Sequence, residues 1–138
     1  MDQKTQQFRW LSKALLVATL SSLGLNAWSQ SDVSAEYRSC MDRVDEVPLQ
    51  FKNRAACMTQ EIKRQDVVLN AEYQQLKRKL KPDQRELLVK AQRTWVKFRS
   101  DWCALEKVSD SAPGGELNRL LCIMELTDQQ IKAIKAIS

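Results

Sequence analysis

Apolar residues recur at alternating steps of three and four along two long stretches of the chain, a spacing typical of amphipathic helices. A tight turn is predicted between the stretches at Lys81-Pro82-Asp83, because proline disfavours a helical conformation in the residue before it. Two striped helices joined by a short turn predict a long antiparallel hairpin. The first stripe is Ile62, Asp66, Leu69, Tyr73, Leu76 and Leu80, and the second is Leu88, Ala91, Trp95, Phe98, Trp102 and Leu105.

Shorter helices are predicted on both sides of the hairpin. One covers residues 32–44, and Pro48 then suits the first position of the long helix that follows it. After a loop at residues 109–115, a short helix is expected over residues 116–125. We therefore expect an all-α fold, a small disulfide-stapled bundle of four to five helices.

Two local signals shape the C-terminal part of this prediction. Gly114-Gly115 suits a loop in which the backbone turns with positive φ. Residues 127–130, TDQQ, have the pattern of a capping box, and Leu126 can pack onto Ile131 as a hydrophobic staple. This pattern predicts that a separate last helix begins here and carries the isoleucines at positions 131, 134 and 137.

Polar residues in the hairpin are interpreted as a structural network. The expected register sets Leu69 opposite Trp95 and Asp66 opposite Phe98. A lone buried carboxylate is costly, so Asp66 needs a partner, and Arg99 is the candidate. Trp95, Phe98 and Trp102 could form a ligand platform, but their helical spacing favours the core. Gln92 and Asn70 are candidates for a hydrogen bond across the hairpin. The full predicted network is Asp66, Asn70, Tyr73, Gln92, Arg93, Trp95 and Arg99.

The first 29 residues have the three-part anatomy of a secretory signal peptide. A positively charged start is followed by the uncharged segment ALLVATLSSLGL, and Ala27 and Ser29 satisfy the small-residue rule for cleavage after Ser29. The apolar segment is too short to span a bilayer. We therefore expect a signal peptide over residues 1–29 and a single domain over residues 30–138, without a membrane span in the mature form. The predicted location is the periplasm or the exterior.

All four cysteines, Cys40, Cys57, Cys103 and Cys122, lie in the predicted mature part. An even number of cysteines in a small exported domain is typical of disulfides. Their spacings of 17, 46 and 19 residues lack the close pairs of a four-cysteine zinc site. Symmetry about the predicted turns favours bridges 40–57 and 103–122. The long hairpin also leaves 57–103 with 40–122 open.

Composition excludes several functional classes. The chain has no histidine, which rules out Ser-His and Cys-His catalysis and HExxH zinc sites. The net charge is +5, and removal of the three basic residues and one acidic residue before position 30 leaves a dispersed +3, so no nucleic-acid partner is expected. No nucleophile, metal or cofactor motif occurs, so we expect neither an enzyme nor a cofactor. Acids that could supply a glycosidase pair are interpreted as a solvated face: Glu61, Asp66, Glu72, Glu86, Asp101 and Glu106.

A family resemblance rests on Cys57, Asp66, Leu69-Asn70, Tyr73, the stretch AQRTWVKFRSDWC at residues 91–103, Gly114-Gly115, Cys122 and Leu126-Thr127. These residues resemble the lysozyme inhibitor LprI-like N-terminal domain family. The likeness extends over about residues 40–135, and AQRxWxxFRxxxC is its most specific part. It implies a small, all-helical, exported domain with cysteine bridges. It also implies that at least one member inhibits lysozyme, while most members have no assigned activity.

Two functional hypotheses follow. In the first, the protein binds a lysozyme or another wall-degrading enzyme and occludes its substrate cleft, with the loop at residues 109–115 as the insertion element. Animal lysozymes are usually basic, so a local acidic patch would attract them. The candidate binding residues are Asp101, Glu106, Asp110, Pro113, Gly114, Gly115 and Glu116. In the second hypothesis, a non-inhibitory envelope module binds another periplasmic protein, or binds anionic wall polymer through the basic residues at positions 77–81. The oligomeric state stays open.

Overall fold

The computed structural model describes residues 32–45, 50–108 and 114–138, and every regular element within these ranges is an α-helix. The helices are α1 (Ala35–Asp45), α2 (Phe51–Lys79), α3 (Pro82–Val108) and α4 (Gly114–Ile137). The predicted all-α class is confirmed. The predicted signal peptide and the predicted helix start at Pro48 lie outside the described residues.

A serine fixes the start of α1 and attaches this helix to α2. The Ser34 hydroxyl accepts a hydrogen bond from the backbone N–H of Tyr37 at 3.0 Å, the geometry of an N-cap. The same hydroxyl donates to Glu61 Oε2 at 2.6 Å, and the Ser34 backbone N–H donates to Glu61 Oε1 at 3.0 Å. Arg64 Nε completes the group with a 3.0 Å contact to Glu61 Oε2. Glu61 can therefore be buried, with only 2% of its surface exposed, because its charge is fully compensated.

The turn between α2 and α3 is short and forms as predicted. Leu80 adopts an extended conformation with φ −82° and ψ 152°, which ends α2. Pro82 opens α3, where its missing N–H leaves no helical hydrogen bond unmade. The side chain of Gln84 accepts a hydrogen bond from the backbone N–H of Lys81 at 3.0 Å, which is half of a capping box.

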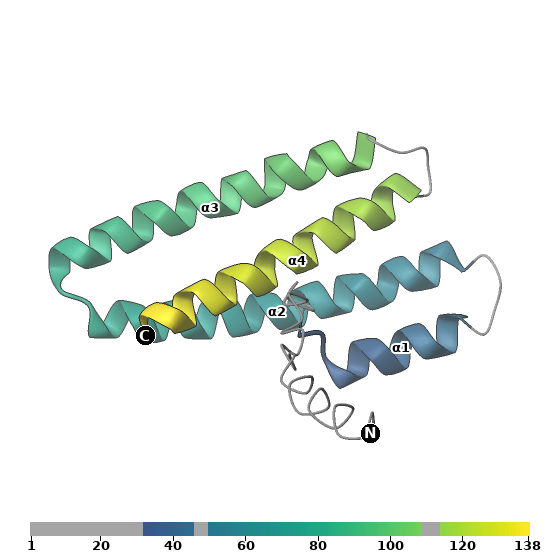
Figure 1. Ribbon diagram of the computed structural model, residues 1–138, viewed down its shortest axis with the longest axis horizontal. Coiled ribbons are helices and arrows are strands. Elements are labelled where there is room, and N and C mark those ends of the chain that lie inside the picture. Colours follow the sequence, from purple (N-terminus) through teal and green to yellow (C-terminus); the bar gives the residue numbers. More distant parts are fainter. Residues whose placement is uncertain (1–31, 46–49, 109–113) are drawn as a thin grey trace, which may run out of the picture. The chain divides into compact units, whose positions relative to one another are not determined.

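The central element is α4, which packs against both α2 and α3 (Figure 1). α1 packs on α2, and α2 and α3 are antiparallel but hardly contact each other. One hydrophobic cluster joins Leu69 and Leu76 of α2 to Ile131 and Ile134 of α4, with Trp95 of α3 packed against it. A second cluster combines Met58, Leu120 and Met124, again from α2 and α4. The expected hairpin is therefore present, but its core is built around the last helix.

α4 is continuous, so the prediction of a helix boundary at the TDQQ sequence is wrong. The hydroxyl of Thr127 donates to the carbonyl of Ile123 one turn earlier at 2.6 Å instead of capping a new helix. Asp128 contacts Lys132 one turn later at 2.8 Å. Both polar side chains thus find partners inside a continuing helix. Gly114 and Gly115, expected in a loop, form the first turn of α4.

Two disulfides connect the helices. Cys40 of α1 is bonded to Cys57 of α2, and Cys103 of α3 is bonded to Cys122 of α4. These are the bridges that the turn symmetry favours, and the alternative pairing 57–103 with 40–122 is excluded. Each bridge joins neighbouring helices across a segment of fewer than twenty residues, with separations of 17 and 19.

The stripe of α3 is only partly buried, which corrects the expectation that its aromatic residues belong to the core. Trp95 is half-buried against the core, whereas Phe98 is 47% exposed and Trp102 is 50% exposed. Cys103 is the only fully buried residue of this helix. The physical reason is that α3 packs on α4 alone, so the periodic stripe has no second partner helix in its C-terminal half.

Candidate functional site

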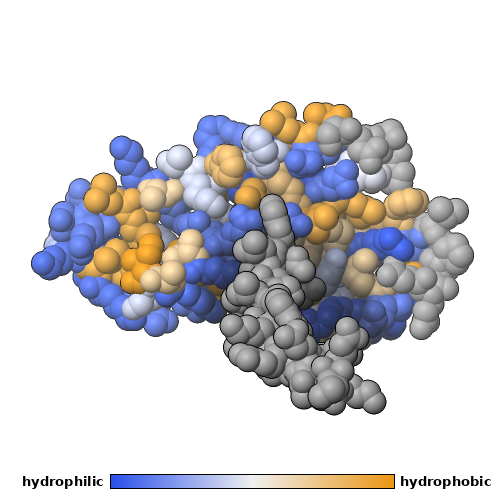
Figure 2. Space-filling model, in the orientation of Figure 1, coloured by the Kyte–Doolittle hydropathy of each residue, from blue (hydrophilic) through white to orange (hydrophobic). Residues whose placement is uncertain are grey.

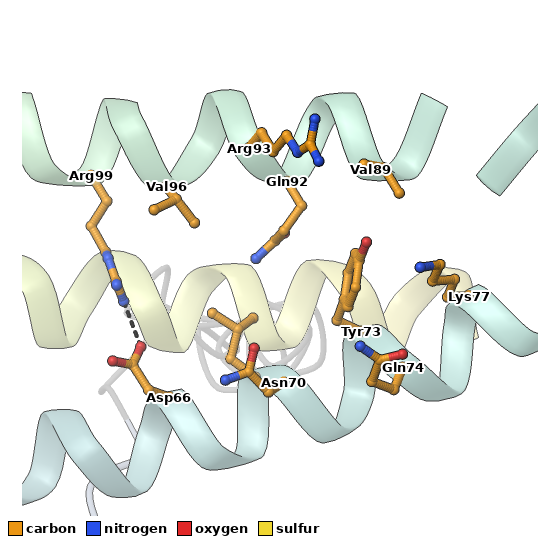
Figure 3. Close-up of a pocket in the computed structure, with 11 residues that line it drawn as sticks. Asp66, Asn70, Tyr73, Gln74, Lys77, Val89, Gln92, Arg93, Val96 and Arg99 are labelled. Atoms are coloured by element: carbon orange, nitrogen blue, oxygen red, sulfur yellow. Dashed lines mark hydrogen bonds and ion pairs between the residues drawn. The ribbon is translucent and has the colours of Figure 1, made fainter. Parts of the chain in front are cut away.

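The predicted partner of Asp66 is confirmed. Arg99 Nη1 of α3 lies 2.8 Å from Asp66 Oδ1 of α2. Figure 3 marks this ion pair with a dashed line. The same nitrogen donates to the Thr127 hydroxyl of α4 at 2.7 Å. The guanidinium also lies over the Trp95 ring, 5.0 Å from its centroid, a cation–π geometry. Arg99 thus links three helices, and its side chain is only 16% exposed.

The other half of the predicted network differs from expectation. Gln92 Oε1 accepts a hydrogen bond from Gln130 Nε2 of α4 at 2.9 Å, instead of one from Asn70. Asn70 and Arg93 are exposed, and Tyr73 is half-buried at the edge of the core. The reason is the position of α4, which contacts α2 and α3 and holds them apart.

A groove of about 600 Å³ lies between α2 and α3 as a consequence (Figure 3). Figure 3 shows side chains from both helices extending toward this space. The predicted network residues therefore line a surface groove as well as support the fold. The lining consists of Asp66, Leu69, Asn70, Tyr73, Gln74, Lys77, Val89, Gln92, Arg93, Val96 and Arg99.

The predicted acidic binding residues lie near the other end of α3, and most of their charge is compensated. Asp101 is paired with Lys97 one turn earlier. Glu116 contacts Arg119 at 2.6 Å and Lys107 at 3.5 Å. Glu106 lines a groove described below. Gly114 and Gly115 are helical, and two further candidates, Asp110 and Pro113, lie outside the described residues.

The ion pairs of Glu116 change its titration. The hydrogen bond from Arg119 holds the pKa of the Glu116 carboxyl below its ordinary value of 4.5, and Lys107 adds to this effect. The same hydrogen bond raises the pKa of Arg119. Glu116 is therefore ionised at neutral pH but committed to two cations, so it offers little net charge to a partner.

A second groove, of about 400 Å³, lies between α3 and α4 next to the Cys103–Cys122 bridge. Its lining includes two carboxylates and no lysine or arginine. Trp102 lies on its α3 side and stacks on Phe98 with ring centroids 5.9 Å apart. The lining residues are Trp102, Glu106, Asn118, Leu121, Cys122, Glu125, Leu126 and Gln129.

Exposed hydrophobic side chains surround this second groove. Figure 2 shows hydrophobic residues gathered over the C-terminal part of α3. Leu105 is 59% exposed and Leu121, across the groove, is 43% exposed. We call Phe98, Trp102, Leu105, Leu121, Glu106 and Glu125 the acidic aromatic surface. A cluster of exposed apolar side chains with a polar rim is typical of a protein-binding site.

Sequence reasoning gave a binding role to only one member of the acidic aromatic surface, Glu106. It favoured the core for the stripe that includes Phe98, Trp102 and Leu105, and it gave no role to Leu121 and Glu125, although both lie one turn apart in the helix predicted over residues 116–125. It also assigned Glu61 to a solvated face, whereas this residue is buried beneath Ser34. The sequence around Ser34 and Tyr37 is compatible with a helix N-cap, but it does not indicate that the Ser34 hydroxyl also binds the distant carboxylate of Glu61.

The residues that the structure describes contain no group of three or more cysteine or acidic side chains placed to hold a metal ion. No helix among α1 to α4 combines the length and the apolar character that a membrane crossing requires.

The fold and its surfaces define a small helical domain with disulfide bridges that exposes two grooves along α3. The chain belongs to the family described as lysozyme inhibitor LprI, whose model matches residues 29–134. This match confirms the resemblance found in the sequence. No curated protein and no solved structure matches the chain significantly. The family and the two disulfides together indicate an extracytoplasmic protein.

Proposed function

We propose that this protein is exported to the periplasm or the exterior and inhibits a lysozyme or a related wall-degrading enzyme by binding over its substrate cleft. The family description supports the class of target. The mechanism is steric occlusion, in which this chain performs no chemistry. The observation that carries the proposal is the acidic aromatic surface, where two exposed, stacked aromatic rings adjoin a groove with two carboxylates.

The chemistry of this surface suits a basic partner. Trp102 offers a large rigid ring of the kind that often dominates the binding energy of interfaces. Glu125 provides a negative charge beside it, in a groove whose lining includes no lysine or arginine. Such local complementarity accelerates encounter with a basic lysozyme even though the whole domain is positive.

The bridge next to this surface limits the entropy cost of binding. Cys103 and Cys122 join α3 and α4 directly beneath the groove, and Cys122 is one of the lining residues. Both walls are therefore fixed before the partner arrives. A preorganised surface loses less conformational freedom on association than a flexible one.

The test is inhibition of wall lysis by oxidised protein titrated against a panel of basic and neutral lysozymes and bacterial lytic enzymes. We expect stoichiometric inhibition of a basic lysozyme. Trp102→Ala should weaken it about 30-fold, the effect of a central interface residue. Leu87→Ala is the matched control, since Leu87 is a 67% exposed hydrophobic residue near the other end of α3. Full inhibition by the Trp102 variant would remove this surface from the mechanism.

The electrostatic part has its own test. Glu125→Gln should slow association with a basic lysozyme about threefold at low salt and lose this effect at high salt. Asp42→Asn removes the same charge from an exposed position of α1 and should leave the association rate unchanged. Equal effects of the two variants would show that only the total charge matters.

A further inference from the structure

The groove between α2 and α3 is strongly basic and continues beyond the residues described above. A neighbouring cavity of about 500 Å³ shares Lys77, Val89 and Arg93 with it and adds further cations toward the start of α3. Together the two cavities are lined by five basic residues, Lys77, Arg85, Lys90, Arg93 and Arg99, and by two acidic ones, Asp66 and Glu86. Asp66 is already bound to Arg99, so the groove carries a net positive charge.

Lys77 and Arg93 are the cations best placed to meet a ligand. Lys77 lies over the Tyr73 ring, 5.9 Å from its centroid, and Arg93 is exposed on the facing helix. Among the described residues, no carboxylate lies within ion-pair distance of either side chain. In Figure 3 the two residues belong to opposite walls, so a ligand between them could contact both.

Amide side chains supply neutral hydrogen-bonding groups between these cations. Asn70 and Gln74 are exposed on α2, one turn apart, and both line the groove. Gln92 lies on the α3 side, and its oxygen accepts from Gln130. The amide nitrogen of Gln92 is therefore the atom that can donate to a ligand. Side-chain amides both donate and accept, which matches the N–H and C=O groups of a peptide backbone.

We propose that this groove binds an extended acidic peptide, with its carboxylates on Lys77 and Arg93 and its backbone on Asn70, Gln74 and Gln92. The groove also has an apolar part formed by Leu69, Val89 and Val96. Apolar side chains and amides favour a peptide over inorganic polyphosphate, which has neither methylene groups nor amides. The site shares no lining residue with the acidic aromatic surface, so each of the two can be altered by substitutions that leave the lining of the other unchanged.

The test measures fluorescence anisotropy of a labelled short peptide of alternating Glu and Gly, titrated with the oxidised protein at low salt. Lys77→Gln with Arg93→Gln should weaken binding about tenfold, as expected for the loss of two solvent-screened charge contacts. Lys52→Gln with Lys63→Gln removes the same charge from exposed positions of α2 that line neither cavity, and should change affinity less than about twofold. Asn70→Leu, which keeps the charge, should weaken binding about threefold while preserving its salt dependence.

Competing probes separate the ligand classes. Inorganic polyphosphate should bind more weakly than the acidic peptide, and a peptide of alternating Lys and Gly should not bind. Soluble stem peptides of the cell wall also carry carboxylates and amides. If they bind more tightly than the Glu-Gly peptide, the ligand is a wall fragment. If they bind more weakly, it is a segment of another protein. Equal losses in the two double variants, tighter binding of polyphosphate, or no binding of either peptide class would overturn the proposal.

Discussion

The two grooves along α3 differ in charge and in the way their walls are joined. The groove between α2 and α3 has three cations and one carboxylate in its main cavity, and Arg99 connects its walls through Asp66. The groove between α3 and α4 has two carboxylates and no cation, and a disulfide connects its walls. One helix therefore presents a basic polar surface with its N-terminal half and an acidic aromatic surface with its C-terminal half.

This difference shows that the net charge of the chain does not describe the charge of its individual surfaces. A net charge of +5 argues against attraction to a basic lysozyme if the charge is spread evenly. In the folded protein, Lys77 is the one α2 cation that lines the basic groove, together with several cations of α3, whereas Glu106 and Glu125 line the other groove. Two surfaces of opposite sign are the basis for proposing two kinds of partner for one small domain.

Removal of the bridge beside the acidic aromatic surface should have the largest effect on stability. Cys103→Ala with Cys122→Ala releases a segment of 19 residues, which costs about 3 kcal/mol in the loop-entropy model. Guanidinium unfolding of the oxidised protein measures this loss. The variant should also inhibit lysozyme more weakly at a temperature where it stays folded, while its affinity for the acidic peptide changes little. Equal weakening of both activities would show that the grooves are not independently supported.

Two tryptophans that lie two turns apart on the same face of α3 provide the next comparison. Trp95→Ala should cost about 2 kcal/mol of unfolding free energy, because the ring packs on the core and under Arg99. Trp102→Ala should cost less than about 1 kcal/mol, since half of its surface is already exposed to solvent. Denaturant titration measures both values. A larger loss for Trp102 than for Trp95 would assign the acidic aromatic surface to the core.

Two arginines of the basic groove are expected to have different roles: Arg99 stabilises the fold, and Arg93 binds a ligand. Arg99→Met should destabilise the fold by about 2 kcal/mol, because it leaves Asp66 and Thr127 without their shared donor. Arg93→Met should change stability by less than about 0.5 kcal/mol, as expected for an exposed side chain. Thermal and denaturant unfolding at one pH provide the measurement. If both variants proved equally stable, the link through Arg99 would have no energetic role.

The smallest effect is expected at Glu116, and it should depend on pH. The folded-state pKa of Glu116 lies below 4.5, so its ion pairs stabilise the fold above that pH, and this stabilisation is lost as the pH falls through the folded value. Glu116→Gln should therefore cost about 0.5 kcal/mol at neutral pH, a small value because the pair is screened by solvent. The difference from the parent protein should vanish in acid. A difference that persists well below pH 4.5 would point to packing instead of charge.

Much of the fold could be predicted because it follows from local patterns. The helical spacing, the Lys81-Pro82 turn and the cysteine symmetry each depend on residues close in sequence, and the structure bears out all three. The Asp66–Arg99 pair could be predicted because the turn fixes the register of the two helices. The local pattern led to a wrong prediction at the TDQQ sequence. The Thr127 hydroxyl, which would otherwise cap a new helix, bonds to Arg99 of α3 and to the Ile123 carbonyl within α4.

The grooves could not be predicted because they depend on where α4 lies. A hairpin with a direct seam has no room between its helices, and only the insertion of α4 against both helices creates the basic groove. The buried stripe of α2 also includes Glu61 and Gln65. Because both residues are polar, a hydrophobicity pattern does not predict that they are buried. Burial of such residues depends on distant partners, as Ser34 is for Glu61.

The most direct measurement compares two double variants in two assays. Trp102→Ala with Glu125→Gln alters the acidic aromatic surface, and Lys77→Gln with Arg93→Gln alters the basic groove. We expect the first variant to lose lysozyme inhibition and keep its affinity for the acidic peptide, and the second to do the reverse. If the first variant still inhibited lysozyme fully while the second did not, the roles assigned to the two surfaces would be wrong.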